Sequence, residues 1–226
     1  MKLLIDDANV LKIKKILECY PCDGVTTNPS ILAKSGKAPY EVLKGIRQII
    51  GKDGELHVQV ISDKAETMVK EAKKIVDVLG DNTYIKIPVI PEGLKAIKIL
   101  KATGYNVTAT AIYTPMQAYL AAKAGADYVA PYINRIDNLG ANGIETAKTI
   151  QNILENNGFN TKVLAASFKN SQQIQALCEY GIGASTAAPD IIEGLIKNAS
   201  VSAAVEDFTK DFHSICGDGK NMSDCE

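Results

Sequence analysis

A lysine lies inside an apolar segment, TYIKIPVI, where its amine has little access to water. Burial disfavours the ammonium form and lowers the pKa of a lysine, and a neutral amine can attack a carbonyl carbon to form a Schiff base. Lys86 is therefore a candidate catalytic nucleophile. Two other interpretations stand beside it, namely an exposed lysine at a strand end and a structural ion pair with Asp6.

Asp6 follows the apolar run KLLI near the N-terminus. A carboxylate within reach of Lys86 can accept the proton of a hydroxyl group while a carbon–carbon bond breaks. The alternative is a helix cap, since Asp and Asn are favoured at that position. Asp6 has the strand parity of an inward-facing residue and Asp7 does not, so we assign the cap to Asp7 or Asn9.

Three neutral hydrogen-bonding side chains, Gln59, Thr110 and Tyr132, lie at the ends of other apolar runs. Such groups can hold a water molecule in a defined position. The alternative is an interior network in which they satisfy one another.

A hydroxyl group and two cations follow the late apolar runs, at Arg135, Ser167 and Lys169. This combination suits a phosphate monoester. The alternatives are a surface pair of Arg135 with Asp137 and a solvated loop charge at Lys169.

Eight short runs rich in β-branched residues recur along the chain, and helical patterns follow them. The runs are KLLIDDA, GVTTNP, LHVQVI, TYIKIPV, NVTATAIY, YVAPYI, KVLAAS and IGAST, and the predicted helices include 63–80, 91–104, 138–158 and 170–181. Eight strand–helix alternations predict a single α/β domain, a closed (β/α)₈ TIM barrel. An open doubly wound sheet is the competing architecture, but the glycine-rich phosphate turn typical of it does not follow an early strand.

Such a barrel brings the ends of its strands together at one rim, where its active sites form. Polar residues at or near the ends of seven runs are therefore predicted to form a ring, made of Asp6, Asn28, Gln59, Lys86, Thr110, Tyr132 and Ser167. Barrel interiors are usually filled with branched apolar residues, so a ring of polar residues at one level of the barrel indicates a catalytic site. With this ring around Lys86, the Schiff-base interpretation is favoured.

A further helix is predicted over 201–215, where apolar residues recur at helical spacing. It is surplus to a closed barrel, and would cover the barrel bottom or pack on a neighbouring subunit. We therefore expect a barrel with an extra C-terminal helix over 1–215, and a frayed tail over 216–226.

The composition is that of a globular protein, with 46% hydrophobic and 23% charged residues among 226. Lys+Arg 25 against Asp+Glu 26 leaves no basic field for nucleic acid, and no apolar stretch is long enough to span a membrane. We expect a cytoplasmic protein that binds neither nucleic acid nor a membrane. The five cysteines form no disulfide framework.

Metal binding is not expected. Cys19 and Cys22 form a single CxxC, and a zinc site needs four ligands. The alternatives are a Cys₄ site with Cys216 and Cys225 and a redox pair. Neither is favoured, because the CxxC falls in a predicted helix-to-strand loop and does not open a helix. His57 is predicted to be a core residue and His213 a surface residue.

Four motifs in order, GVTTNPSI, IKIPV, APYINRIDNLG and LAASFKN, resemble the small transaldolase and fructose-6-phosphate aldolase family. The resemblance runs from Met1 to about the last predicted helix. It implies a cofactor-free cytoplasmic enzyme that acts on sugar phosphates, and a homo-oligomer, typically a decamer in which the C-terminal helix reaches a neighbour.

The resemblance also implies roles for individual residues. Lys86 matches the lysine that forms the Schiff base, and Asp6 matches the aspartate that assists cleavage of the C3–C4 bond. Asn28, with Thr26 nearby, matches the group that binds sugar hydroxyls. The implied phosphate-binding residues are Arg135, Ser167 and Lys169.

Two activities occur in this family, and a few positions separate them. Transaldolases commonly carry glutamate and phenylalanine where this chain has Gln59 and Tyr132, and serine where it has Ala130. The resemblance thus favours cleavage of fructose 6-phosphate to dihydroxyacetone and glyceraldehyde 3-phosphate. The alternative is a transaldolase that moves a dihydroxyacetone unit between sugar phosphates. A third hypothesis is a non-catalytic sugar-phosphate binder or a redox-responsive scaffold that uses Cys19 and Cys22.

Overall fold

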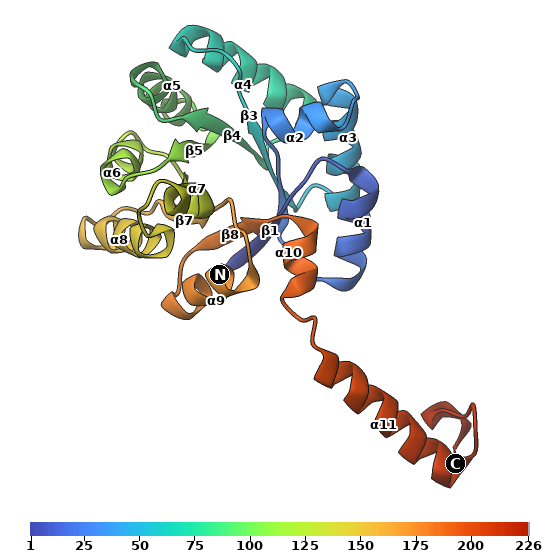
Figure 1. Ribbon diagram of the computed structural model, residues 1–226. Helices are drawn as coiled ribbons and strands as arrows, with labels where there is room; N and C mark the ends of the chain where they lie inside the picture. The colour runs from blue at the N-terminus through green and yellow to red at the C-terminus, as the bar shows by residue number, and fades with distance from the viewer. Residues whose placement is uncertain (226) are drawn as a thin grey trace. The chain divides into compact units, whose positions relative to one another are not determined.

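The computed structural model describes residues 1–225, which divide into two compact units, Met1–Ile192 and the segment from Glu193 on. The first unit is a closed barrel of parallel strands in the order β1 to β8, surrounded by helices (Figure 1). The strands are β1 (Lys2–Asp6), β2 (Gly24–Thr26), β3 (Glu55–Gln59), β4 (Thr83–Pro88), β5 (Asn106–Ile112), β6 (Tyr128–Pro131), β7 (Lys162–Ala165) and β8 (Ala184–Ala187). The predicted (β/α)₈ barrel is confirmed, and each predicted run overlaps one strand. β3 begins one residue before its run, and β8 ends one residue after its run.

Helices follow every strand, and all of them except α4 and α7 begin at a side-chain cap or a proline. They are α1 (Val10–Cys19), α2 (Pro29–Lys34), α3 (Pro39–Ile50), α4 (Ala65–Leu79), α5 (Pro91–Ala102), α6 (Pro115–Lys123), α7 (Ile133–Asn138), α8 (Gly143–Asn156), α9 (Ser171–Tyr180) and α10 (Pro189–Gly194). The Asn9 side chain caps α1 by accepting from the Lys12 backbone N–H at 3.1 Å. A cap of this kind satisfies an N–H that has no partner within the helix.

The predicted helix over 138–158 differs from the structure. α7 ends at Asn138 and α8 begins only at Gly143. Asn142 caps α8, and the Asp137 side chain accepts from the Gly143 N–H at 2.7 Å. These side-chain contacts stop one helix and start the next, which apolar spacing alone does not show.

The hydrophobic core lies between the strands and the helices. Ile85 and Ile87 of β4 and Val107 and Ala109 of β5 are completely buried in it. The predicted strand parity is therefore confirmed here. Because alternate residues point to opposite faces of a strand, Lys86 and Thr108 face the barrel interior.

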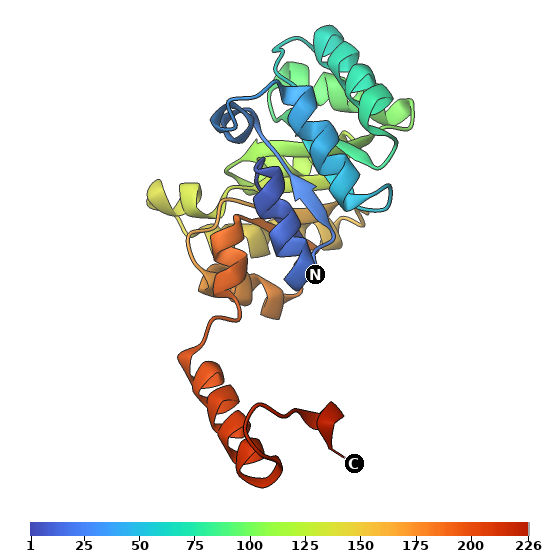
Figure 2. The same cartoon turned by 90° about the vertical axis from the view of Figure 1, so that its right-hand side faces the viewer.

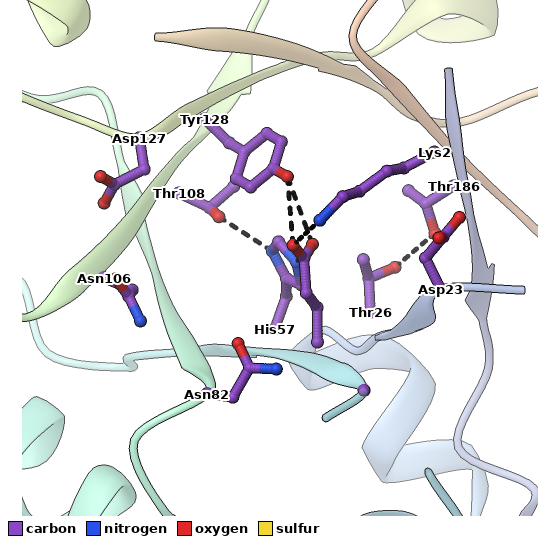
Figure 3. A network of polar contacts seen from close by, with 12 residues as sticks. Lys2, Asp23, Thr26, His57, Asn82, Asn106, Thr108, Asp127, Tyr128 and Thr186 are labelled. Carbon is purple, nitrogen blue, oxygen red and sulfur yellow. Dashed lines mark hydrogen bonds and ion pairs between the residues drawn. The ribbon is translucent and has the colours of Figure 1, made fainter. Parts of the chain in front are cut away.

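The floor of the barrel holds a charged network (Figure 3). Glu55 accepts hydrogen bonds from Lys2 and from the Tyr128 hydroxyl, the latter at 3.3 Å. The His57 ring lies between Glu55 at 3.4 Å and the Thr108 hydroxyl at 2.9 Å, and it stacks on Tyr84.

These contacts determine the charges in the floor. Burial raises the pKa of Glu55, but hydrogen bonds from His57 and Lys2 outweigh it and lower the value to about 2. Burial lowers the pKa of His57, which is completely buried as predicted. A neutral His57 donates to the ionised Glu55 through Nε2, so Nδ1 accepts from Thr108.

The second unit contains α11 (Ala199–Cys216) and a short 3₁₀ helix, η1 (Met222–Asp224). The predicted extra helix is confirmed. Within 216–225, where we expected a frayed tail, the chain turns back beside the end of α11 (Figure 2). Glu226 lies outside the described residues. No helix in 1–225 is both long enough and apolar enough to cross a membrane.

Gly93 allows α5 to lie directly against the end of β4, two residues beyond Lys86. A Cβ atom at this position would lie 2.0 Å from the Pro88 carbonyl oxygen and 3.3 Å from Ile87. Both neighbours belong to the strand that carries Lys86. The close approach of helix and strand therefore requires glycine.

We expect Gly93→Ala to lower the free energy of unfolding by about 1–3 kcal/mol, because the added methyl group forces α5 away from β4. Gly194→Ala is the matched control, since a Cβ there meets no atom within 4 Å. Chemical denaturation of both variants measures the difference. Equal midpoints for the two variants would contradict the close packing of α5 on β4.

Candidate active site

Lys86 projects into the barrel near the C-terminal end of β4. Its side chain is buried, with 6% of the residue exposed, and Nζ donates to the Thr27 carbonyl oxygen at 2.7 Å. Gln59 of β3 and Thr108 of β5 are its partners in the strand register. The structure thus excludes an exposed lysine at the strand end.

The surroundings of Lys86 favour a neutral amine. Burial lowers its pKa, and the attraction of Asp6 opposes this only in part. Nζ donates its hydrogen bond to a backbone carbonyl, which is an acceptor without a full counter-charge. A lysine held in this way is ready to act as a nucleophile.

Asp6 ends β1 and belongs to the same interior layer. Thr26 of β2 donates to its Oδ1 at 2.7 Å. Burial raises the pKa of Asp6, while Lys86 and the Thr26 hydrogen bond lower it. Because Asn9 caps α1, the Asp6 carboxylate is available to the interior, as its strand parity predicts.

The last strand also contributes to this layer. Thr186 of β8 lies 2.7 Å from Thr26, hydroxyl to hydroxyl, and is buried. The predicted ring stopped at the seventh strand and missed Thr186. Thr186 is the last residue of the eighth predicted run, IGAST, and this polar run end was a signal present in the sequence.

Tyr132 follows β6, and its hydroxyl lies 2.9 Å from that of Thr110. Thr110 is completely buried on β5. The register between β5 and β6 shifts after Ala109, and Ala111 adopts φ 59. This irregularity shows that the end of β5 is not a regular strand where it meets Tyr132. Gln59, the third of the predicted water-binding residues, pairs with Lys86 on the other side of β4.

Arg135 lies over the Tyr132 ring, with its guanidinium carbon 4.7 Å from the ring centre. A hydrogen bond with Tyr113 raises the pKa of Arg135. These two residues line a cavity of about 400 Å³ together with Asn138 and Leu139. Tyr113, which also packs edge-on against Tyr132, was not among the predicted site residues.

Asp137, the alternative partner proposed for Arg135, has another role. Its two oxygens accept from the Gly143 N–H and from Gln173 Nε2, each at 2.7 Å. It therefore ties α8 and α9 to α7, the short helix that carries Arg135. The guanidinium group instead packs on an aromatic face, where it is open to an anionic ligand.

Ser167 and Lys169 follow β7, next to the segment that carries Arg135. The Asn134 N–H donates to the Ser167 carbonyl at 2.8 Å, which fixes the two segments side by side. Ser167 adopts φ 65, a rare conformation outside glycine. Lys169 is exposed at the rim.

Asn28 begins α2 and has a structural task. Its Oδ1 accepts from the Ile31 N–H at 3.0 Å. This cap leaves the two hydrogens of the side-chain amide as the donors with which Asn28 can bind a ligand.

No group of three or more His, Cys, Asp or Glu side chains in residues 1–225 is arranged to hold a metal ion. Cys19 is exposed and Cys22 is half-buried, and both are free thiols. Burial raises the pKa of Cys22 to about 11, so its reactive thiolate form is disfavoured.

Comparisons with known proteins show which family this chain is similar to. A family model described as transaldolase/fructose-6-phosphate aldolase matches residues 3–224. A probable fructose-6-phosphate aldolase of Streptococcus pneumoniae is 42% identical over 95% of this chain and 97% of its own length. A probable transaldolase of Thermodesulfovibrio yellowstonii is 41% identical over 95% of this chain and 99% of its own length.

The lowered pKa of Lys86 has a consequence for stability. Below the pKa of an unfolded lysine, about 10.4, the unfolded chain binds a proton that the folded chain binds less well. The free energy of unfolding therefore contains a contribution that rises with pH toward that value. Lys86→Met removes this contribution and keeps a side chain of similar length.

We expect Lys86→Met to fold with a thermal midpoint at pH 7 equal to or above that of the wild type. Its midpoint should also rise less steeply between about pH 7 and 10. The control is Lys95→Met on the exposed side of α5, which should follow the wild type. A strong destabilisation by Lys86→Met alone would show that Lys86 is a structural cation.

Proposed function

Because the chain belongs to the transaldolase/fructose-6-phosphate aldolase family, we propose that it is a class I aldolase. Its reaction is the reversible cleavage of fructose 6-phosphate to dihydroxyacetone and glyceraldehyde 3-phosphate. The observation that carries this proposal is the burial of Lys86 in a layer of hydrogen-bonding groups, where its neutral amine is favoured. Neither a metal nor an organic cofactor is needed for this chemistry.

The first step joins the substrate to the enzyme. The lone pair of Lys86 Nζ attacks the C2 ketone of fructose 6-phosphate to give a carbinolamine. The carbinolamine takes up the proton that the Asp6 carboxyl gives up and loses water, which leaves an iminium. The iminium carries a positive charge that the free amine does not have. A nearby positive charge lowers the pKa of a carboxyl group, so this step ionises Asp6 when a base is required.

Cleavage then follows between C3 and C4. Asp6 takes the proton of the C4 hydroxyl, the C4 oxygen forms a carbonyl, and the C3–C4 electrons move into the iminium to give an enamine. Glyceraldehyde 3-phosphate leaves. Thr26 supports this step, because its hydrogen bond orients the Asp6 carboxylate toward the interior.

The enamine must next receive a proton at C3. We assign this proton to a water held by Tyr132, Thr110 and Gln59, of which the first two are already in hydroxyl contact at 2.9 Å. Hydrolysis of the protonated product releases dihydroxyacetone and regenerates Lys86. All three side chains are neutral and can both donate and accept hydrogen bonds, so they can hold a water molecule in place.

The remaining predicted residues bind the rest of the sugar phosphate. Asn28 binds a hydroxyl group through its free amide hydrogens, and the phosphate lies between Arg135 and the segment of Ser167 and Lys169. Arg135 is suited to this task because a guanidinium group binds phosphate oxygens with parallel hydrogen bonds. The hydrogen bond from the Asn134 N–H to the Ser167 carbonyl keeps the two sides of this pocket in place.

A transaldolase is the second candidate, because one of the relatives carries that name. Such an enzyme would keep the enamine until an acceptor aldehyde, such as erythrose 4-phosphate, replaced the first product. The two activities differ in whether a proton or an aldehyde reaches the enamine carbon first. Tyr132 and Gln59 favour the proton, because they can hold water beside that carbon.

The deciding experiment is incubation with fructose 6-phosphate alone, with glyceraldehyde 3-phosphate measured by a coupled dehydrogenase. We expect release over many turnovers without an acceptor. Release that stops near one equivalent per site, and resumes when erythrose 4-phosphate is added, would establish the transaldolase. Borohydride reduction in the presence of fructose 6-phosphate should join the sugar to Lys86 in either case. A wild-type chain without this adduct would instead be a non-catalytic binder.

We expect Tyr132→Phe to lower the acceptor-free turnover roughly 10²-fold, because the phenylalanine cannot hold the water that protonates the enamine. Transfer to erythrose 4-phosphate should fall less, so the ratio of hydrolysis to transfer decreases. Tyr119→Phe makes the same chemical change on α6, where the ring packs against Phe159, and should leave the ratio as it is. An unchanged ratio of hydrolysis to transfer in Tyr132→Phe would contradict the role of Tyr132 in holding the water.

A further inference from the structure

Two thiols meet in the second unit, at the end of α11. Cys216 is the last residue of this helix, and Cys225 lies beyond the 3₁₀ helix η1. Their Sγ atoms are 3.1 Å apart, and both side chains are half-buried. Figure 1 shows the segment after α11 folding back beside the end of the helix.

Local residues of the tail produce this contact. Gly217 and Gly219 have φ 100 and φ 73, values that L side chains rarely adopt, and they reverse the chain directly after α11. Asn221 then begins η1 with a capping box, in which its side chain accepts from the Ser223 N–H and the Asp224 side chain accepts from the Asn221 N–H, both at 2.8 Å. The turn and the cap together return Cys225 to Cys216.

The other cysteines are placed differently. Cys19 and Cys178 are exposed and Cys22 is half-buried, and no thiol contact joins any of these three within residues 1–225. The CxxC of Cys19 and Cys22 is the pair that sequence spacing singles out. The structure instead brings together two cysteines that are nine positions apart.

We propose that Cys216 and Cys225 are a modification site, at which a low-molecular-weight disulfide oxidises the two thiols to an intramolecular disulfide. One cysteine, as its thiolate, attacks the small disulfide and releases one small thiol, which leaves a mixed disulfide on the protein. The second cysteine then attacks the protein sulfur and releases the other small thiol. The two protein thiols lose two electrons and two protons, and the small disulfide gains them.

The product would connect the tail covalently to the end of α11. In the reduced protein, backbone and cap hydrogen bonds hold the turn at 217–224. In the oxidised protein, the disulfide closes this turn into a covalent loop. The loop has less conformational freedom than the reduced segment when its hydrogen bonds are broken. This inference is independent of the aldolase proposal, because it uses no residue of the barrel.

The test equilibrates the full-length protein with mixtures of oxidised and reduced glutathione, then traps free thiols with N-ethylmaleimide and digests with trypsin. Cleavage after Lys210 and Lys220 places Cys216 and Cys225 on separate peptides. A disulfide therefore appears as peptides 211–220 and 221–226 joined together. We expect this species to form to the same extent at every protein concentration.

A parallel equilibration in urea separates the folded geometry from mere closeness in the sequence. We expect the effective concentration of the two thiols to be about tenfold or more higher in the native protein than in urea. Equal values would overturn the proposal, as would a joined peptide that increases with protein concentration. Cys216→Ser should leave Cys225 as a glutathione adduct, and Cys178→Ser, the control, should leave the joined peptide unchanged.

Discussion

The burial of one amine inside a barrel is the constraint on which the rest of this structure depends. Lys86 must be far enough from water for its pKa to fall, yet it needs a hydrogen-bond acceptor, because an unpaired polar group in the interior is costly. The Thr27 carbonyl at 2.7 Å supplies the acceptor. Closure of β1 against β8 keeps water from reaching the amine through an open sheet edge.

The barrel interior separates two kinds of polar layer along its axis. In the floor, Glu55 is ionised and compensated by Lys2, with His57 neutral beside it. In the upper layer, burial shifts Lys86 and Asp6 in opposite directions, and both shifts favour the uncharged forms. The floor thus holds a compensated charge below the site, while the upper layer holds groups whose charges can change during a reaction.

The upper rim is built less from strands than from contacts between the segments that follow them. Arg135 lies on Tyr132, whose hydroxyl meets Thr110, and Asp137 joins the same segment to α8 and α9. The charged and aromatic side chains beside the cavity are therefore held by several contacts with neighbouring segments. Such a framework keeps binding groups in place without the help of the ligand.

The order of eight strands, the inward parity of Lys86 and the polar character of the rim could all be predicted from the sequence, because alternation and helical spacing are local properties of the chain. The break between α7 and α8, the partnership of Thr26 with Thr186 and the meeting of Cys216 with Cys225 could not. Each depends on side chains that reach a partner across a turn or across the barrel. Periodicity shows which face a residue occupies, but only the closed tertiary structure decides which residue it meets there.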